Sequence, residues 1–190
     1  MRSPVVSPRP GMLLVATPAL ADPNFERTVI LVLDSDEDGA LGVVLNRPSP
    51  VDVAAVLPGW AEAASSPAVL FQGGPVSTES ALAVALRDPA VARLPEGFRE
   101  VDERFAIVDL DEEFDGSIEG VVAVRVFAGY AGWSAAQLEA EIDEGSWFVV
   151  DAEPGDLHSG EPEAMWRKVL RRQRSELAWV SLMPEDPTMN

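Results

Sequence analysis

Few side chains of this chain could carry out covalent or proton-transfer chemistry. The sequence has one histidine, His158, and no cysteine, which excludes thiolate nucleophiles, thiolate metal sites and disulfides. A serine nucleophile would need His158 as its base, yet no Gly-x-Ser-x-Gly motif is present to expose such a serine. His158 lies among Pro, Gly and Asp residues, which indicates a solvated loop. The sequence therefore specifies no catalytic residue and no cofactor.

Two acidic turns resemble the first half of a calcium-binding loop. Asp34–Gly39 and Asp111–Gly116 each place acidic residues at positions 1, 3 and 5 and a glycine at position 6. The twelfth position, which needs a bidentate Glu, is Leu45 in the first case and Val122 in the second. We therefore expect ordinary turns here and no metal site.

Glycines and aromatic residues follow two predicted strands. Gly73, Gly74 and Pro75 follow the strand Ala68–Gln72. A second set stands after the strand Glu119–Phe127: Gly129, Tyr130, Gly132 and Trp133. The carboxyl ends of strands commonly form ligand crevices, and glycines let a ligand approach the backbone. The alternative is that the glycines form tight turns and that Tyr130 and Trp133 fill the core, because aromatic side chains mostly pack.

A helix with start and stop signals is predicted directly after the second set. Ser134 as N-cap and Gln137 three residues later form a capping box, while Trp133 and Leu138 form a hydrophobic staple. Gly145 suits the C-terminal end of the helix, and the strand Trp147–Val150 follows. This strand–helix–strand connection is long enough for a right-handed parallel crossover.

Apolar and β-branched runs predict the other strands. Thr28–Leu33 and Ala40–Asn46 flank a short acidic turn, which is typical of a β-hairpin. Three further strands are expected at Met12–Ala16, Arg104–Leu110 and Leu177–Leu182. Ser80–Leu86 could be a helix or a strand, because its periodicity does not decide between them.

Two more helices are predicted. Ser49 as N-cap, followed by Pro50 and Asp52, predicts a helix that ends by Leu57. Glu161–Arg174 predicts an amphipathic helix, and its segment Arg167–Arg174 holds five of the 14 cations. A basic helix permits a nucleic-acid hypothesis. The formal net charge of −18 repels phosphate backbones, so direct nucleic-acid binding is unexpected.

The chain length of 190 residues fits one domain at residues 9–183, or two interlocked lobes within it. Residues 1–8 are expected to be a disordered leader and residues 184–190 a tail. No apolar run reaches the roughly 18 residues of a membrane span, so no membrane partner is expected. The segment from Arg2 to Ala21 weakly imitates a signal peptide, and its alternative interpretation is a strand followed by a loop.

Several motifs together resemble the YqgE/AlgH family of small bacterial proteins. They run in family order from about residue 11 to 170: Leu14–Pro18 with Asp22-Pro23-x-Phe25, Gly39–Pro48, Gly73–Pro75, Gly129–Trp133, Gln137–Glu141 and Trp147. The resemblance implies an α/β (α+β) fold, a mixed β-sheet flanked by helices in a family-specific topology. It makes residues 11–25 part of the fold, which favours a cytoplasmic location over export. It also favours a strand at Ser80–Leu86, and it does not extend past Gln173.

The family has no established activity, so three functional hypotheses stand. The first is a binding or regulatory module for a small molecule or a protein partner, with a crevice formed by Asn46, Arg47, Gly73–Pro75 and Gly129–Trp133; Gln137 and Glu141 complete the candidate site. The second is an enzyme that uses Tyr130, Glu141 or Arg47. The third is a transcriptional regulator that acts through Arg167–Arg174 on DNA, or through a protein partner. The sequence does not indicate an oligomeric state.

Overall fold

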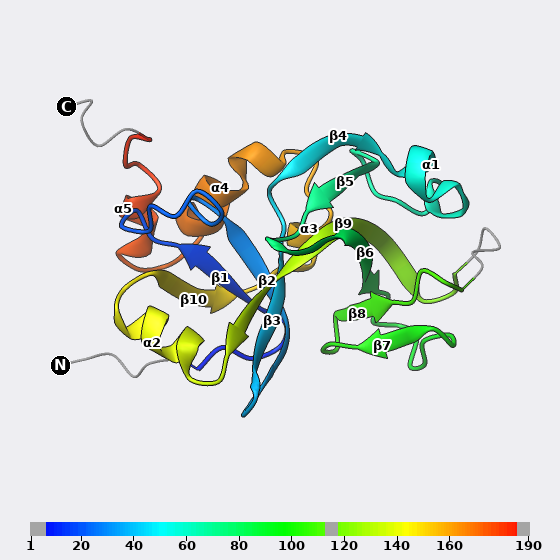
Figure 1. Cartoon of the computed structure of the whole chain (residues 1–190), viewed down its shortest axis with the longest axis horizontal. Helices are drawn as coiled ribbons and strands as arrows, with labels where there is room; N and C mark the ends of the chain where they lie inside the picture. The colour runs from blue at the N-terminus through cyan, green and yellow to red at the C-terminus, as the bar shows by residue number, and fades with distance from the viewer. Residues whose placement is uncertain (1–6, 113–117, 186–190) are drawn as a thin grey trace.

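The computed structural model describes residues 7–112 and 118–185, in which ten strands form one curled sheet with short helices around it (Figure 1). Most of the predicted leader and tail lies outside these residues, although Pro8 is described and buried. The strands are β1 (Met12–Ala16), β2 (Val29–Asp36), β3 (Gly39–Val44), β4 (Pro48–Asp52), β5 (Val69–Gln72), β6 (Val76–Arg87), β7 (Phe98–Glu100), β8 (Phe105–Val108), β9 (Val121–Ser134) and β10 (Trp147–Asp151).

The helices are all short. Two are 3-10 helices, η1 (Pro58–Trp60) and η2 (Pro162–Ala164). The α-helices are α1 (Val53–Val56), α2 (Gln137–Asp143), α3 (Pro154–Leu157), α4 (Met165–Arg171) and α5 (Leu177–Val180). No helix of the described residues is long and apolar enough to cross a membrane.

Strand β9 joins the two halves of the sheet. Its first part pairs antiparallel with β6 and parallel with β5, and its last part pairs antiparallel with β3. The strand order is β10-β1-β2-β3-β9-β6-β8-β7, with β4 attached to β5 at the side. The other strand pairs are antiparallel. The fold is therefore α+β with a mixed sheet, which confirms the predicted fold class.

The hairpin of β2 and β3 confirms the sequence prediction for Thr28–Asn46. Val29–Val32 are fully buried, as expected for an apolar β-branched run. Asp36 begins the turn and accepts a hydrogen bond from the backbone N–H of Asp38 at 2.8 Å. The acidic residues of this segment thus form a turn. The second acidic turn, Asp111–Gly116, lies partly outside the described residues.

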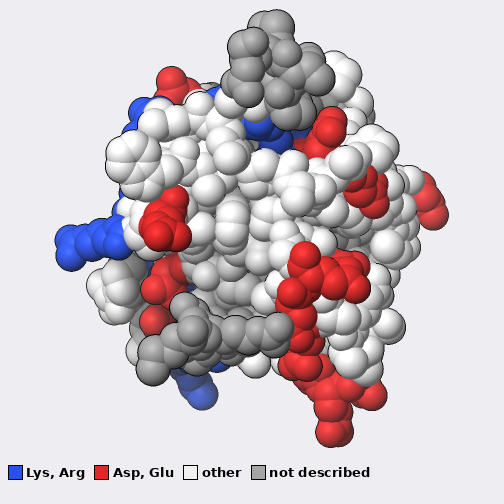
Figure 2. Space-filling model, turned by 90° about the vertical axis from the view of Figure 1, so that its left-hand side faces the viewer, with Lys and Arg blue, Asp and Glu red and all other residues white. Residues whose placement is uncertain are grey.

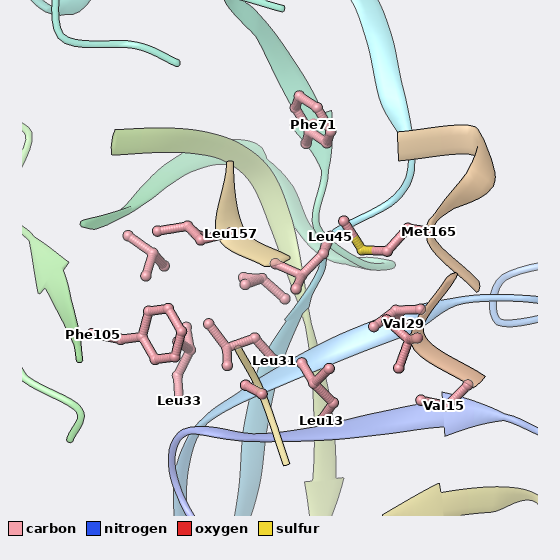
Figure 3. Close-up of a cluster of buried hydrophobic side chains, with 14 of the residues drawn as sticks. Leu13, Val15, Val29, Leu31, Leu33, Leu45, Phe71, Phe105, Leu157 and Met165 are labelled. Atoms are coloured by element: carbon pink, nitrogen blue, oxygen red, sulfur yellow. The ribbon is translucent and has the colours of Figure 1, made fainter. Parts of the chain in front are cut away.

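The largest hydrophobic core lies between the sheet and the helices α3 and α4 (Figure 3). Leucines and valines of β1 and β2 meet Phe71, Phe105, Leu157 and Met165 there, and most of these side chains are fully buried. Truncating one buried leucine to alanine would cost about 2–5 kcal/mol. This core therefore joins the two halves of the sheet, because it contains side chains of β1, β2 and β3 and of β5, β6 and β9.

The predicted helix at Ser49–Leu57 is wrong in its first half. Residues Pro48–Asp52 form β4, which pairs with β5, and only Val53–Val56 are helical. The predicted strand Leu177–Leu182 is also wrong, because Leu177–Val180 form α5. Leu177 and Val180, three residues apart, both pack on the main core, which is helical spacing. In both segments the tertiary neighbours overrode the local preference.

Strand β9 is longer than predicted, and the helix after it starts later. The strand continues through both glycines to Ser134, and the helix N-cap is Ala136, with a φ of +62°. Ser134 is not the N-cap, although the side chain of Gln137 accepts a hydrogen bond from its backbone N–H at 3.0 Å. Gly145 ends the helix with a φ of +86°, as predicted.

The predicted strand–helix–strand crossover joins strands that run in the same direction, because four antiparallel pairings lie between β9 and β10, but the two strands are not neighbours. β10 pairs antiparallel with β1, and three strands separate it from β9. The segment around Ser80–Leu86 is a strand, β6, in agreement with the family resemblance. The strands predicted at Met12–Ala16 and Arg104–Leu110 are confirmed as β1 and β8.

Arg125 of β9 is a buried cation that sequence reasoning missed. It donates to the carbonyls of Ser159 (3.1 Å) and Ser66 (2.8 Å) and lies 4.2 Å from the centre of the Phe71 ring. Burial lowers the pKa of its guanidinium to about 10. Because its partners are carbonyls and a ring, Arg125 connects three distant segments without a carboxylate among the described residues.

Candidate functional site

The aromatic motif residues form a closed cluster beneath helix α2. The Phe25 ring stacks on Trp133 at 6.4 Å and meets the edge of Trp147 at 5.7 Å. The two indole N–H groups both donate to Oε2 of Glu141, at 2.8 Å and 2.9 Å, and Gln137 Nε2 donates to Oε1 at 3.1 Å. Every indole donor of this cluster is therefore paired.

Burial shows what the cluster does. Trp133 is 6% exposed and Trp147 is 4% exposed, and both belong to the core that α2 covers. Glu141 accepts hydrogen bonds from both indoles, and Gln137 bridges Glu141 and Ser134. These residues fill and lock the interior, so the alternative interpretation of Trp133 as a core residue is correct.

The glycines of the two motifs touch each other directly. A β-carbon on Gly74 would lie 2.2 Å from the backbone carbonyl of Tyr130, and one on Gly73 would lie 2.3 Å from the backbone oxygen of Gly129. Gly129 itself has a φ of +75°. The glycines thus permit two backbones to approach each other, and they were correctly predicted to lie together.

Asn46 and Arg47 hold the loop that contains Phe25. Asn46 accepts from the backbone N–H of Val29 at 3.0 Å and donates to the carbonyl of Arg27 at 2.9 Å. Arg47 donates through Nη1 to the carbonyl of Asn24 at 2.7 Å and through Nη2 to that of Glu26 at 3.1 Å. Arg47 therefore clamps the chain on both sides of Phe25, which ties the loop to the aromatic cluster.

An open groove lies beside this clamp. Its cavity volume is about 470 Å³, which is within the range of small-molecule sites. It is lined by residues of β3, β4, β5, β6, β9 and neighbouring loops: Asn24, Val44, Arg47, Ser49, Val51, Leu70, Gln72, Gly74, Pro75, Thr78 and Ala128.

Arg47 carries the one charged side chain among the described residues that line the groove. A guanidinium has five N–H donors, and the two carbonyls use one donor each of Nη1 and Nη2. Its other donors meet no acceptor among the described residues, and no described carboxylate pairs with it. The groove therefore presents an oriented cation that can still bind an anion.

Thr78 reaches the groove because β6 bulges. Val76 pairs with Tyr130 and Ala81 pairs with Ala128, so the residues between them have no partner on β9. Ser77, at the start of this bulge, has a φ of +48°. Bulges are common next to functional sites, because they redirect side chains.

The predicted crevice therefore divides into two regions. Arg47, Gly74 and Pro75 line the groove, whereas Trp133, Gln137 and Glu141 belong to the closed cluster. Asn46 and Gly73 stabilise the neighbouring backbone, and Tyr130 packs against the main core. Sequence reasoning missed the other polar lining residues, Asn24, Ser49, Gln72 and Thr78, which carry no motif of their own.

The residues of the enzyme hypothesis do not share a cavity. Arg47 lines the groove, while Glu141 lies under α2 and Tyr130 packs on the core. The three residues come from β9, α2 and the chain after β3, and no described cavity contains two of them.

Most cations of the basic helix α4, and that of Arg172 directly after it, pair with groups of the same chain. Arg172 pairs with Asp156 at 2.6 Å, Lys168 pairs with Glu161, and Arg167 donates to the carbonyl of Ser181. Figure 2 shows the side of the molecule that carries α2 and α5, where acidic and basic side chains lie scattered around a broad uncharged area. This face has no continuous basic stripe of the kind that follows a nucleic-acid backbone.

Comparison with known proteins agrees with this fold. The profile of the AlgH-like family matches residues 13–178. A UPF0301 protein of Streptomyces coelicolor is 56% identical over 187 residues, with 97% of each chain covered. A crystal structure of a Corynebacterium diphtheriae protein has a TM-score of 0.86 at 33% identity, with 96% of this chain and 95% of that chain covered.

The solution structure of AlgH from Pseudomonas aeruginosa has a TM-score of 0.66 at 28% identity and covers 97% of this chain and 98% of that chain. The fold and the profile together define a small α+β protein built around one long shared strand. The chain belongs to the AlgH-like family, whose molecular function is not established. The resemblance drawn from the sequence motifs is confirmed.

Proposed function

We propose that this chain is a cytoplasmic binding module that takes a small ligand with an anionic head and an apolar body in the Arg47 groove. The observation that carries the proposal is that the guanidinium of Arg47 keeps N–H donors without a partner among the described residues. The chain has 32 acidic residues, yet no described carboxylate pairs with this cation, which lies in an open cavity and is available for an external anion.

The arrangement of Arg47 favours binding. Its guanidinium is already oriented by the carbonyls of Asn24 and Glu26, so little side-chain entropy is lost when a ligand binds. Charge-assisted hydrogen bonds to such a group are stronger than neutral ones. The same clamp flanks Phe25, and this gives the site a physical connection to the aromatic cluster through which a bound ligand can regulate a partner.

The other lining residues of the groove indicate the chemistry of the ligand body. Val44, Val51, Leu70 and Pro75 supply apolar surface, and Gln72 and Thr78 supply neutral hydrogen-bonding groups. A carboxylate or a phosphate monoester on an apolar body matches this combination. A cationic ligand does not, because Arg47 would repel it.

A thermal-shift and calorimetric titration tests the proposal. Four probes share one ring and differ in the head group: phenylacetate, phenyl phosphate, benzyl alcohol and benzylamine. We expect the two anions to bind and stabilise the protein, with the preferred anion identifying the head group, and the alcohol and amine not to bind. Equal binding of all four, or of none at millimolar concentration, would contradict the proposal.

Two variants separate binding from folding. Arg47→Gln removes the cation and is expected to weaken anion binding by about tenfold or more. Ala128→Leu leaves Arg47 intact and fills the groove from β9, so it should weaken binding of the aromatic probes as well. Arg99→Gln is the matched control, since Arg99 is an exposed cation that lies outside the groove.

A further inference from the structure

A second cavity lies on the other half of the sheet, away from the Arg47 groove. Its volume is about 530 Å³. It is formed by the end of β6 and the loop after it, the end of β7 and the loop after it, the start of β9 and the start of α3: Leu86, Arg87, Asp88, Pro89, Val91, Ala92, Glu100, Glu103, Arg104, Val122 and Pro154. The cavity combines cations, carboxylates and apolar side chains.

Arg104, one of the two cations of the cavity, uses four of its five N–H donors within the fold. Its Nε and Nη2 both donate to Oδ2 of Asp102, at 3.1 Å and 2.8 Å. Its Nη2 also donates to the carbonyl of Gly11 at 3.0 Å, and its Nη1 donates to the carbonyl of Ala152. Arg104 therefore connects chain segments, and its charge is already paired with Asp102.

Arg87 is different, because most of its guanidinium N–H groups have no hydrogen-bond partner among the described residues. The side chain is only 10% exposed, and Nη1 donates to the carbonyl of Asp102 at 3.1 Å and pairs with Glu100 at 2.9 Å. Nε is buried without any hydrogen-bond partner, and Nη2 meets no acceptor among the described residues. Nη2 is therefore free to donate to an added acceptor, whereas the buried Nε takes no part in the binding described below.

The existing partner of Arg87 can be replaced. The side chain of Glu100 is 63% exposed, so its ion pair with Arg87 is screened by water and is weak. A ligand carboxylate in the cavity could take the place of Glu100 on Nη1 and also accept from Nη2. This two-point geometry is the arrangement in which Arg binds carboxylates best.

The acidic groups of the cavity restrict the ligand further. Among the described residues, Glu103 makes no ion pair and Asp88 uses only Oδ1, which accepts from the backbone N–H of Ala90 at 2.9 Å. These carboxylates oppose a simple anion and favour a ligand that also carries an ammonium group. Val91, Ala92, Val122 and Pro154 offer apolar surface, and Val122 is 60% exposed.

From this cavity we infer a second binding site, for a free α-amino acid with an apolar side chain. The carboxylate of the amino acid binds Nη1 and Nη2 of Arg87 in place of Glu100. The ammonium group faces Asp88 and Glu103. The apolar side chain covers the exposed surface of Val122 and its neighbours.

Calorimetric titration of the full chain with L-leucine, 4-methylpentanoate and 3-methylbutylamine tests the chemistry of the ligand. The second probe lacks the ammonium group of leucine and the third lacks its carboxylate. We expect leucine to bind about tenfold or more tightly than either analogue. Equal binding of leucine and one analogue, or no binding of leucine at millimolar concentration, would overturn the inference.

Substitutions then test the position of the site. Arg87→Gln is expected to weaken leucine binding by about tenfold or more, while the exposed control Arg99→Gln leaves it unchanged. Glu100→Gln changes an exposed side chain and keeps the fold, and it should tighten binding by roughly two- to fivefold because it removes the competitor of the ligand. If leucine binding is insensitive to Glu100→Gln, or weakened by it, the inference fails, even where Arg87→Gln does not fold.

Discussion

The closed cluster around Glu141 and the open groove beside Arg47 both contain a charged side chain, but they differ in how completely its hydrogen-bonding groups are paired. Ala128 of β9 lines the groove and Trp133 belongs to the cluster, roughly 16 Å further along the same strand. In the cluster, both indole N–H groups meet one carboxylate oxygen. In the groove, the guanidinium has donors left and a cavity in front of it. Unpaired hydrogen-bond donors therefore distinguish the open groove from the closed cluster.

The loop that carries Phe25 belongs to both regions. Its ring packs between Trp133 and Trp147, while the carbonyls on either side of it accept hydrogen bonds from Arg47. The two regions are therefore mechanically connected although they differ in chemistry. Substitutions that affect only one of them should separate stability from binding.

The largest effect is expected at the glycine contact between the two regions. Gly74→Ala would place a β-carbon 2.2 Å from the Tyr130 backbone, where neither side can yield, and we expect a loss of about 3 kcal/mol or more in the free energy of unfolding. Gly155→Ala is the matched control, since a β-carbon there meets nothing within 4 Å. Denaturant unfolding of both variants measures the difference, and a similar cost at the two positions would refute the close approach.

The next largest effect tests the closed cluster. Glu141→Leu leaves two buried indole N–H groups without an acceptor, so we expect it to cost about 2–4 kcal/mol of stability. Glu139→Leu, on the exposed side of the same helix, should cost less than about 0.5 kcal/mol. Thermal unfolding followed by tryptophan fluorescence distinguishes the two, and anion binding by folded Glu141→Leu protein should persist.

A smaller effect on stability is expected at Arg47. Arg47→Leu removes two hydrogen bonds to exposed loop carbonyls that water can satisfy, so the loss of stability should be about 1 kcal/mol. Binding of phenylacetate should nevertheless disappear. A variant that retains full affinity for the anion would show that the groove does not use its cation.

The smallest effect is expected at Thr78. Thr78→Val keeps the volume of an exposed side chain, so stability should change by less than about 0.5 kcal/mol. Loss of one neutral hydrogen bond to the ligand should weaken anion binding by roughly three- to tenfold. Ser80→Ala, in the same bulge but outside the groove, provides the control, and calorimetry should find its affinity unchanged.

Much of the fold could be predicted from the sequence, because its signals are local. The β-branched run of β2 and the acidic turn after it specify a hairpin whatever surrounds them. The ends of β9 and the helix at Ser49 could not be predicted in this way. Ser134 and Ser49 both carry good capping signals, but pairing with β3 and the connection to β5 keep their segments extended.

The candidate site was predicted only in part, for a related reason. Arg47, Gly74 and Pro75 belong to recognisable motifs, so their proximity could be proposed. Whether the hydrogen-bonding groups of a polar side chain are already paired depends on partners that are distant in sequence. The role of Glu141 requires the position of Trp147 on another strand, and Thr78 enters the groove only because β6 bulges.

The central claim is that the groove is open to ligands while the cluster is closed. An NMR titration of the ¹⁵N-labelled protein with phenylacetate tests it most directly, because backbone amides and indole N–H groups are observed together. We predict that the largest chemical-shift changes occur at Arg47, Gln72, Gly74 and Thr78, with both indole N–H groups remaining protected from exchange with water. Shifts that are largest at the indoles of Trp133 and Trp147, with the groove amides unchanged, would contradict the account.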